Sequence, residues 1–236
     1  MIDKRCSSAH EAVAPVHDGA TVMIGGFGSA GSPVELIHAL IDHGARGLTV
    51  ISNNAGCGRV GLAALIEAGR VERIICSFPR SADAEVFAAA FRAGRVALDL
   101  VPQGTLAERV RAGGAAIPAF YTPVSAGTPL GEGKERRSFG GRECVLEHAL
   151  TADFALVRAE RADRYGNLVY RKTARNFGPV MCMASRVAIV QARRIVEPGE
   201  IDPEVVVTPG VFVQRVVEVR DPADESALVR EGRRYP

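Results

Sequence analysis

Four short apolar runs recur along the first half of the chain, and an amphipathic segment follows each of them. The runs are rich in Val, Ile and Leu and begin near residues 21, 48, 73 and 97. Helical spacing of apolar residues follows the first run, as in Leu36, Ile37, Leu40 and Ile41. Continuous apolar runs suit strands buried on both faces, and strands that alternate with helices are typical of a parallel sheet with right-handed crossovers. The pattern therefore predicts an α/β fold built from βαβ repeats.

Turn and capping residues set the expected boundaries of these elements. Ser8, Ser32 and Thr105 are each followed three residues later by Glu, which is the capping-box pattern of a helix start, and Pro33 fits the first helical position. Glycines mark the expected helix ends. We expect strands over 21–24, 48–52, 73–78 and 97–101, and helices from residue 8, over 33–43, 60–69 and 82–93, and from residue 105 to Gly113.

The second half of the chain is less regular. Residues 115–141 contain three prolines and several glycines, so we expect an irregular excursion that is either a mobile lid or a structural crossover loop. Hairpins are expected over 137–146 and 153–171, and further strands over 187–190, 205–207 and 211–219. The charged tail from Asp221 is expected to fray. Together these features predict one domain over 1–236, with an open, mostly parallel sheet and mixed or antiparallel strands in its C-terminal third.

Polar or glycine-rich loops follow all four predicted strands of the first half. These loops are 25–28, 52–54, 77–80 and 102–104. In open α/β sheets, ligands bind beyond the carboxyl ends of the strands, so we expect a binding site at this edge. The first loop joins a strand to a helix N-terminus, an arrangement that can cradle a phosphate, a carboxylate or an oxyanion.

The same glycine loop also matches a dinucleotide-binding pattern. Gly26, Gly28 and Gly31 have the spacing G-x-G-x-x-G. That fingerprint also requires an acidic residue about 20 positions further on to hold the ribose, and the second strand ends in Asn53-Asn54 instead. The missing acid argues against a nicotinamide-dependent dehydrogenase.

Composition excludes several other classes of protein. The 236 residues carry a formal net charge of +2, which favours neither a nucleic-acid partner nor an anionic membrane surface. The five cysteines and five histidines lack metal-ligand spacing, so no metal site is expected. The N-terminus has no apolar signal core, and no run approaches the ~18 apolar residues of a membrane helix. We expect a soluble, cytoplasmic protein.

Several spaced blocks of the chain resemble one known family. The blocks at 18–33, 52–56, 101–109 and 174–177 are similar to those of the family I coenzyme A transferases, in their A (alpha) subunit, and the likeness extends from about 12 to 219. Within the family, residues 76–80 and 175–179 resemble the 3-oxoadipate branch more than the acetoacetate branch.

The resemblance implies an activity and a partner. It implies CoA transfer from succinyl-CoA to 3-oxoadipate, with the CoA thioester as substrate and no tightly bound cofactor. In members of the family, the nucleophile is a glutamate in a Ser-Glu-Asn-Gly block of the B subunit. The reaction proceeds through an acyl-glutamyl anhydride and a glutamyl-CoA thioester. This chain contains no such block, so the nucleophile is expected from a B subunit, in an A2B2 assembly. Transfer to acetoacetate, and a non-catalytic module that binds sugar phosphates, are the alternatives.

The resemblance also assigns roles to residues at the predicted sheet edge. Gln103 is the expected oxyanion donor, since attack on a thioester builds negative charge on the carbonyl oxygen, and capping of the adjoining helix is its alternative role. Asn53 is expected to face the ligand. Asn54 is a further substrate-binding candidate, although one of the two asparagines can instead fix the turn. The coenzyme or acyl chain is expected to approach the loop of Gly25, Gly26, Phe27, Gly28, Ser29, Ala30 and Gly31.

Arg80 is a candidate from its position and charge. A 3-oxo dicarboxylate carries a second carboxylate that acetoacetate lacks, and an arginine after the third strand can hold it in a bidentate pair. An ordinary surface arginine is the alternative. If Arg80 has this role, Arg80→Ala raises KM for the dicarboxylate and leaves acetoacetate unaffected.

Overall fold

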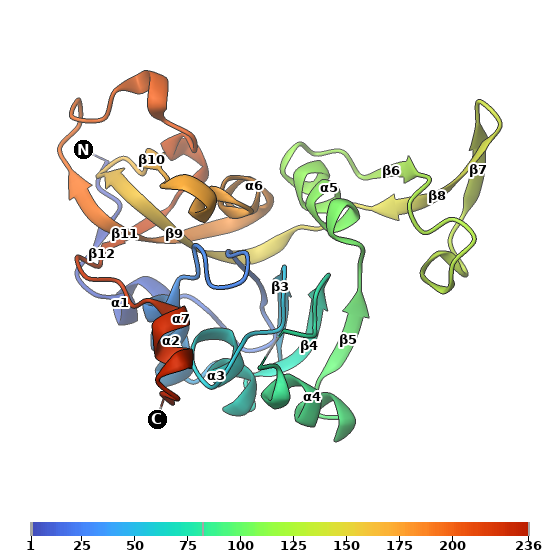
Figure 1. Ribbon diagram of the computed structural model, residues 1–236. Helices are drawn as coiled ribbons and strands as arrows, with labels where there is room; N and C mark the ends of the chain where they lie inside the picture. Colours follow the sequence, from blue (N-terminus) through green and yellow to red (C-terminus); the bar gives the residue numbers. More distant parts are fainter. Residues whose placement is uncertain (1, 82, 236) are drawn as a thin grey trace.

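The computed structural model describes residues 2–81 and 83–235, and a nine-stranded sheet forms its centre (Figure 1). Eight strands follow the order β1, β12, β11, β9, β2, β3, β4, β5, and every neighbouring pair in that order is parallel. The short β10 pairs with β9 in the antiparallel direction. The mostly parallel α/β fold is thereby confirmed. The bounds are β1 Arg5–Cys6, β2 Thr21–Ile24, β3 Leu48–Ser52, β4 Val71–Cys76, β5 Ala97–Leu100, β9 Ala152–Asp163, β10 Leu168–Val169, β11 Ser185–Val196 and β12 Arg215–Glu218.

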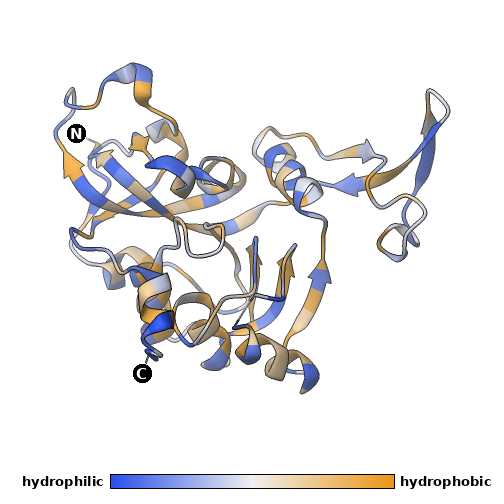
Figure 2. Ribbon diagram, in the orientation of Figure 1, coloured by the Kyte–Doolittle hydropathy of each residue, from blue (hydrophilic) through white to orange (hydrophobic). Residues whose placement is uncertain are grey.

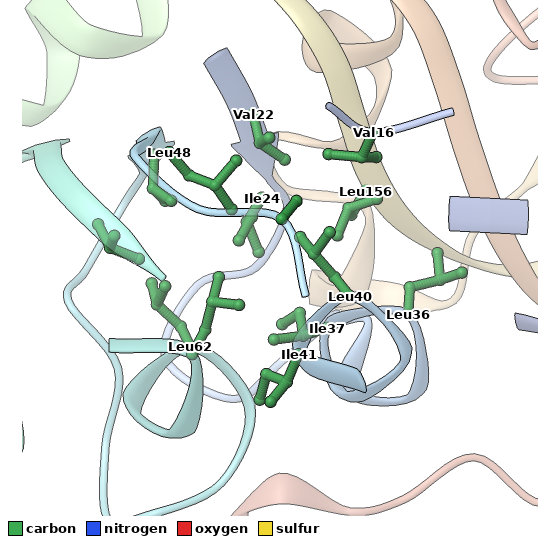
Figure 3. Close-up of a cluster of buried hydrophobic side chains, with 14 of the residues drawn as sticks. Val16, Val22, Ile24, Leu36, Ile37, Leu40, Ile41, Leu48, Leu62 and Leu156 are labelled. Carbon is green, nitrogen blue, oxygen red and sulfur yellow. The ribbon is translucent and has the colours of Figure 1, made fainter. Parts of the chain in front are cut away.

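Two layers of helices enclose this sheet, because its strands are apolar on both faces. Along β2, Val22 and Ile24 point into a core shared with α2 and α3, whereas Met23 points into a second core shared with α5 and α6. Figure 3 shows the first core, to which α2 contributes Leu36 and Leu40. The helices are α1 Ala9–Val13, α2 Val34–His43, α3 Gly61–Glu67, α4 Glu85–Arg92, α5 Gln103–Gly114, α6 Gly178–Ala184 and α7 Glu225–Arg230.

Most elements of the first half lie where the pattern placed them, but two of the three predicted capping boxes are wrong. Ser8 caps α1 as expected, since its Oγ accepts from the N–H of Glu11 at 3.1 Å. The N-cap of α2 is Pro33, which has no side-chain acceptor. Helix α5 begins at Gln103, two residues before Thr105. The buried hydroxyl of Thr105 has no hydrogen-bond partner among the described residues.

The predicted irregular excursion over 115–141 contains regular secondary structure over part of its length. It contains β6 Ala119–Thr122 and β7 Arg136–Phe139, which flank β8 Arg142–His148 in a small antiparallel sheet. The predicted hairpin at 137–146 is confirmed as β7 and β8. This small sheet projects from the body of the molecule (Figure 1), and β7 is exposed along its length and largely hydrophilic (Figure 2).

The last third of the chain differs more from the prediction. The hairpin over 153–171 is confirmed as β9 and β10, although β10 has only two residues. Residues 205–207 do not form the predicted strand, because Val205 is the last residue of a 3-10 helix, Pro203–Val205, whose N-cap is Asp202. Of the strand predicted over 211–219, only β12 forms, and the strand over 187–190 is the middle of β11. The tail does not fray: it forms α7, whose N-cap is Asp224.

Candidate active site

The carboxyl ends of β2 to β5 meet at one edge of the sheet, and a cavity of about 600 Å³ lies there. The parallel direction of these strands explains why loops far apart in sequence share it. Its walls come from the loops after β2, β3 and β4, from the first residue of α5, and from α7. The lining residues are Phe27, Gly28, Ser29, Asn53, Asn54, Gly56, Cys57, Phe78, Ser81, Gln103, Glu225, Ser226, Val229 and Arg230.

Three polar side chains form a hydrogen-bonded set at the strand ends, called here the strand-end network: Asn53, Ser77 and Gln103. The Asn53 Oδ1 accepts from Gln103 Nε2 at 2.7 Å and from Ser77 Oγ at 3.1 Å. Asn53 is only 3% exposed, and its carbonyl oxygen also accepts from the N–H groups of Ser77 and Phe78. A primary amide has two N–H donors, so Gln103 uses one to hold its position and keeps one for a ligand.

Asn54 is hydrogen-bonded within its own loop region. Its Oδ1 accepts from the N–H of Gly56 at 2.8 Å, and its Nδ2 lies 3.4 Å from the carbonyl oxygen of Gly28. This is the geometry of an Asx turn, in which a side chain replaces a backbone turn bond. Of the two asparagines, Asn54 therefore has the contacts of the residue that fixes the turn, and Asn53 those of the residue that positions Gln103.

The glycine loop reaches the cavity only at its tip. Of the seven residues predicted there, Phe27, Gly28 and Ser29 line the cavity, whereas Gly25, Gly26, Ala30 and Gly31 are not among its lining residues. Gly28 has φ +59° and open space where a Cβ would project, so a ligand can approach its backbone closely.

Asn176 holds the base of the glycine loop from a distant part of the chain. Its Oδ1 accepts from the N–H of Gly26 at 3.1 Å, and its Nδ2 donates to the carbonyl oxygen of Ala30 at 2.9 Å. A Cβ on Gly31 would lie 2.6 Å from the carbonyl oxygen of Ala174. Glycine at this position is thus required by close packing of the segment around Asn176 against the loop.

Part of the predicted anion cradle is occupied by the protein itself. The N–H of Leu36 in the first turn of α2 donates to Gln191 Oε1 at 3.2 Å. Glu35 accepts from Gln191 Nε2 and from the N–H of Ala223, so it joins α2 to the C-terminal segment rather than to Ser32. The N-terminus of α2 therefore serves packing, and the open part of the cradle is the tip of the glycine loop.

One wall of the cavity was not predicted at all. It consists of Glu225, Ser226, Val229 and Arg230 on α7 and is called here the C-terminal wall. Local sequence offered one weak signal for it, the helix-capping residue type of Asp224, whose Oδ1 accepts from the N–H of Ala227. The residues that α7 contacts lie far away in the sequence, so no local pattern indicates where it docks.

The end of the chain anchors the C-terminal wall. The ring of Tyr235 stacks on His38 with centroids 3.8 Å apart, and its hydroxyl donates to Asp42 at 2.7 Å. His38 Nε2 accepts from the N–H of Gly61 at 3.0 Å, and burial lowers the pKa of His38 to about 4. His38 is thus neutral at physiological pH, as an acceptor must be.

Glu225 is the one carboxyl group of the cavity lining, and it is turned into the protein. Its side chain is hydrogen-bonded to Ser32, and a Cβ on Gly61 would lie 2.9 Å from its Oε1. The residue is 6% exposed, and burial raises its pKa to about 7. Among the lining residues, therefore, no exposed carboxylate is available to attack a thioester.

Arg80, the other predicted substrate residue, lies elsewhere. It is exposed to solvent beyond β4 and is not among the residues that line the cavity. Its predicted contact with a second carboxylate remains a prediction.

The described residues form neither a metal-binding cluster nor a membrane-spanning helix. Over residues 2–81 and 83–235, no group of three or more His, Cys, Asp or Glu side chains could hold a metal ion. In the same part of the chain, no helix has the length and apolar character needed to cross a bilayer.

Comparison with known proteins gives a consistent result. The model of the family Coenzyme A transferase matches residues 6–219. The chain is 56% identical to the A subunit of the 3-oxoadipate CoA-transferase of Pseudomonas putida, over 96% of this chain and 98% of that protein. It is 48% identical to the A subunit of the probable succinyl-CoA:3-ketoacid coenzyme A transferase of Bacillus subtilis, over 91% of this chain and 89% of that protein.

A solved structure shares the fold. The acyl-CoA transferase YdiF of Escherichia coli O157:H7, as apoenzyme, superimposes with a TM-score of 0.82 at 22% identity, over 94% of this chain. The matched region is 48% of the YdiF chain, so this chain spans about half the length of that protein.

Proposed function

Since the chain belongs to the coenzyme A transferase family, we propose that it is the A subunit of an enzyme that moves CoA from succinyl-CoA to 3-oxoadipate. The 56% identity to the A subunit of a 3-oxoadipate CoA-transferase supports 3-oxoadipate as the acceptor. The observation that carries the proposal for this site is the strand-end network, in which Asn53 fixes one amide N–H of Gln103 and leaves the other for a ligand. Transfer to acetoacetate is the alternative, because acetoacetate is a 3-keto acid and the Bacillus subtilis relative is named a probable succinyl-CoA:3-ketoacid coenzyme A transferase.

In the proposed reaction, this chain stabilises charge and a partner supplies the nucleophile. A glutamate carboxylate of the B subunit first attacks the thioester carbonyl carbon, and the former carbonyl oxygen becomes negative. The free N–H of Gln103 is a preorganised donor for that oxygen, and its neutral amide does not compete as a nucleophile. Loss of the CoA thiolate leaves an acyl-glutamyl anhydride, and the thiolate then attacks the glutamyl carbonyl to give the glutamyl-CoA thioester and the free acid. The steps reverse with 3-oxoadipate as acceptor.

The rim of the cavity supports a partner at this edge. Phe27 and Phe78 line the cavity and are 51% and 57% exposed, and Leu100 at the end of β5 is 42% exposed. Large apolar side chains that gather beside a site are typical of surfaces covered by another chain. We therefore place the B subunit over the carboxyl ends of the strands, within an A2B2 assembly.

Reconstitution tests the proposal. The chain is purified alone and with a family B subunit, and transfer of CoA from succinyl-CoA to 3-oxoadipate or acetoacetate is followed for both samples. We expect turnover only from the complex, with the higher kcat/KM for 3-oxoadipate. Full activity of the chain alone would refute the divided active site. A monomer that binds a sugar phosphate and ignores acyl-CoA would instead favour the non-catalytic module.

A further inference from the structure

We propose that Arg230 on α7 binds the second carboxylate of a dicarboxylic acyl group in the cavity and so selects dicarboxylic over monocarboxylic substrates. This inference rests on the proposed function and deepens it, because it assigns the substrate class to a residue. It also gives to the C-terminal wall the role that the sequence suggested for Arg80.

The charges of the cavity lining single out Arg230. Among the lining residues, only Glu225 and Arg230 are acidic or basic, and the rest are small, aromatic, apolar or neutral polar residues. The carboxyl group of Glu225 is buried against Ser32 and Gly61. Across the described residues, Arg230 makes no ion pair and no side-chain hydrogen bond. Arg230 is exposed to solvent at the cavity wall. A dianionic acyl group thus finds one cation at that wall, and this cation does not have to leave a carboxylate of the protein to bind it.

Helical geometry directs Arg230 toward the cavity. Ser226, Val229 and Arg230 all line it, and residues three and four positions apart share one face of a helix. Ser226 also meets the glycine loop, where its hydroxyl is hydrogen-bonded to Ser29. The face of α7 that carries Arg230 is therefore the face that lines the cavity.

The position of α7 is held at several points along the segment. The N–H of Ala223 donates to Glu35 before the helix, and Val229 packs so closely that a Cβ on Gly58 would lie 2.9 Å from its Cγ2. After the helix, the N–H of Tyr235 donates to the carbonyl oxygen of Arg59 at 3.0 Å. Because contacts before, within and after α7 hold this helix, the backbone at Arg230 has a defined position, which lowers the entropy cost of binding.

The chemistry of the two ends of the substrate fits this arrangement. The thioester end needs neutral donors, which the strand-end network supplies, whereas a remote carboxylate needs a cation. A guanidinium matches a carboxylate with two parallel N–H···O bonds, and such charge-assisted pairs are stronger than neutral hydrogen bonds. Acetoacetate has no second carboxylate, so it gains nothing from Arg230.

The experiment compares substrates rather than total activity. The complex with a family B subunit is assayed as wild type, Arg230→Ala and Arg230→Lys, with Arg233→Ala as the matched control, because Arg233 is an exposed arginine of the same segment outside the cavity lining. The covalent enzyme intermediate gives ping-pong kinetics, in which kcat/KM for one substrate does not depend on the other. Thermal melting and co-elution with the B subunit check that each variant folds and assembles.

We expect Arg230→Ala to lower kcat/KM ~10- to 100-fold for 3-oxoadipate and for succinyl-CoA, with most of the change in KM, and to leave acetoacetate within ~2-fold. Arg230→Lys should retain part of the preference, because it keeps the charge but not the fork geometry. An equal loss for all substrates, or no loss for either dicarboxylate, would overturn the proposal.

Failure of the proposed function gives a different result. If the wild-type complex transfers CoA to acetoacetate but not to 3-oxoadipate, the proposed acceptor is wrong. Arg230 is then still tested by succinyl-CoA against acetoacetyl-CoA as donors, since only the succinyl group has a second carboxylate. Arg80→Ala, assayed in parallel, decides between the two arginines.

Discussion

The strand-end network and the C-terminal wall line the same cavity but are built in opposite ways. The network consists of side chains that directly follow parallel strands, and its members are satisfied by one another: Asn53 accepts from both Ser77 and Gln103. The wall is a short helix whose position depends on contacts with residues 150 or more positions away, such as Glu35 with Ala223. One region thus fixes the reacting end of the substrate through the strands of the sheet, whereas the other can change its sequence without changing the strands.

The largest expected effect is a loss of kcat on substitution of Gln103, in the strand-end network. Gln103→Ala removes the proposed oxyanion donor, and loss of one such donor typically lowers kcat ~10²- to 10³-fold. The loss should be equal for dicarboxylic and monocarboxylic acceptors, because every thioester develops the same oxyanion. Steady-state kinetics of the complex measures both. A change confined to one acceptor would show that Gln103 binds substrate rather than stabilising the oxyanion.

The strand-end side of this comparison was predictable from local sequence. Apolar runs place β3, β4 and β5, and parallel pairing then brings Asn53 and Gln103 together at one edge. The roles of these two residues, however, came from family resemblance and not from the pattern. The expected helix cap at Thr105 was wrong because α5 begins at Gln103 itself.

The other side was not predictable, for a physical reason. A charged tail after Asp221 has the composition of a fraying end, and its docking depends on a buried Glu225, a Tyr235 ring and partners such as His38. Asn176 likewise holds the glycine loop from 150 residues away. Long-range contacts of this kind leave no periodicity in the segment that makes them.

The hydrogen bond from Gln103 to Asn53 is expected to hold the oxyanion donor in place. Asn53→Ala removes the acceptor that fixes Gln103, so the amide of Gln103 is no longer preorganised toward the oxyanion. We expect kcat to fall ~10- to 100-fold, less than for loss of the donor itself. KM should change little, because the remaining cavity is intact. Ser77→Ala is the matched control, since it removes one donor to the same Asn53 oxygen and leaves Gln103 in place. If Ser77→Ala is as damaging as Asn53→Ala, the bond to Gln103 is not the important one.

The third prediction addresses the stability of the C-terminal wall through pH. The pKa of Glu225 is raised by burial from 4.5 to about 7. A raised pKa in the docked state stabilises docking below pH 4.5, and this contribution is lost as pH rises to about 7. The full difference is about 3 kcal/mol. Once corrected for intrinsic rates, hydrogen exchange of the α7 amides should therefore be ~10- to 100-fold faster at pH ~8 than at pH ~5.5.

Glu225→Gln provides the control for that experiment. Glutamine cannot ionise and retains a donor and an acceptor for Ser32, so the exchange of α7 should lose its pH dependence and be slow at pH ~8. Amides of β3, in the centre of the sheet, should show no such pH dependence in either protein. If the variant keeps the pH dependence of the wild type, another group controls the docking of α7.

The smallest effect is expected at Asn54, which lines the same cavity but belongs to neither region. Its amide bonds to Gly56 and Gly28 are internal to the loops, so Asn54→Ala should lower the free energy of unfolding by about 1 kcal/mol. Denaturant unfolding measures that loss, and kcat/KM should fall less than ~3-fold, because the bond from Gln103 to Asn53 and the contacts that hold α7 do not involve Asn54. A tenfold or larger fall in kcat/KM with unchanged stability would instead place Asn54 against the substrate. That result would show that the turn is part of the substrate-binding surface. A bound substrate would then contact the turn as well as the strand-end network and the C-terminal wall.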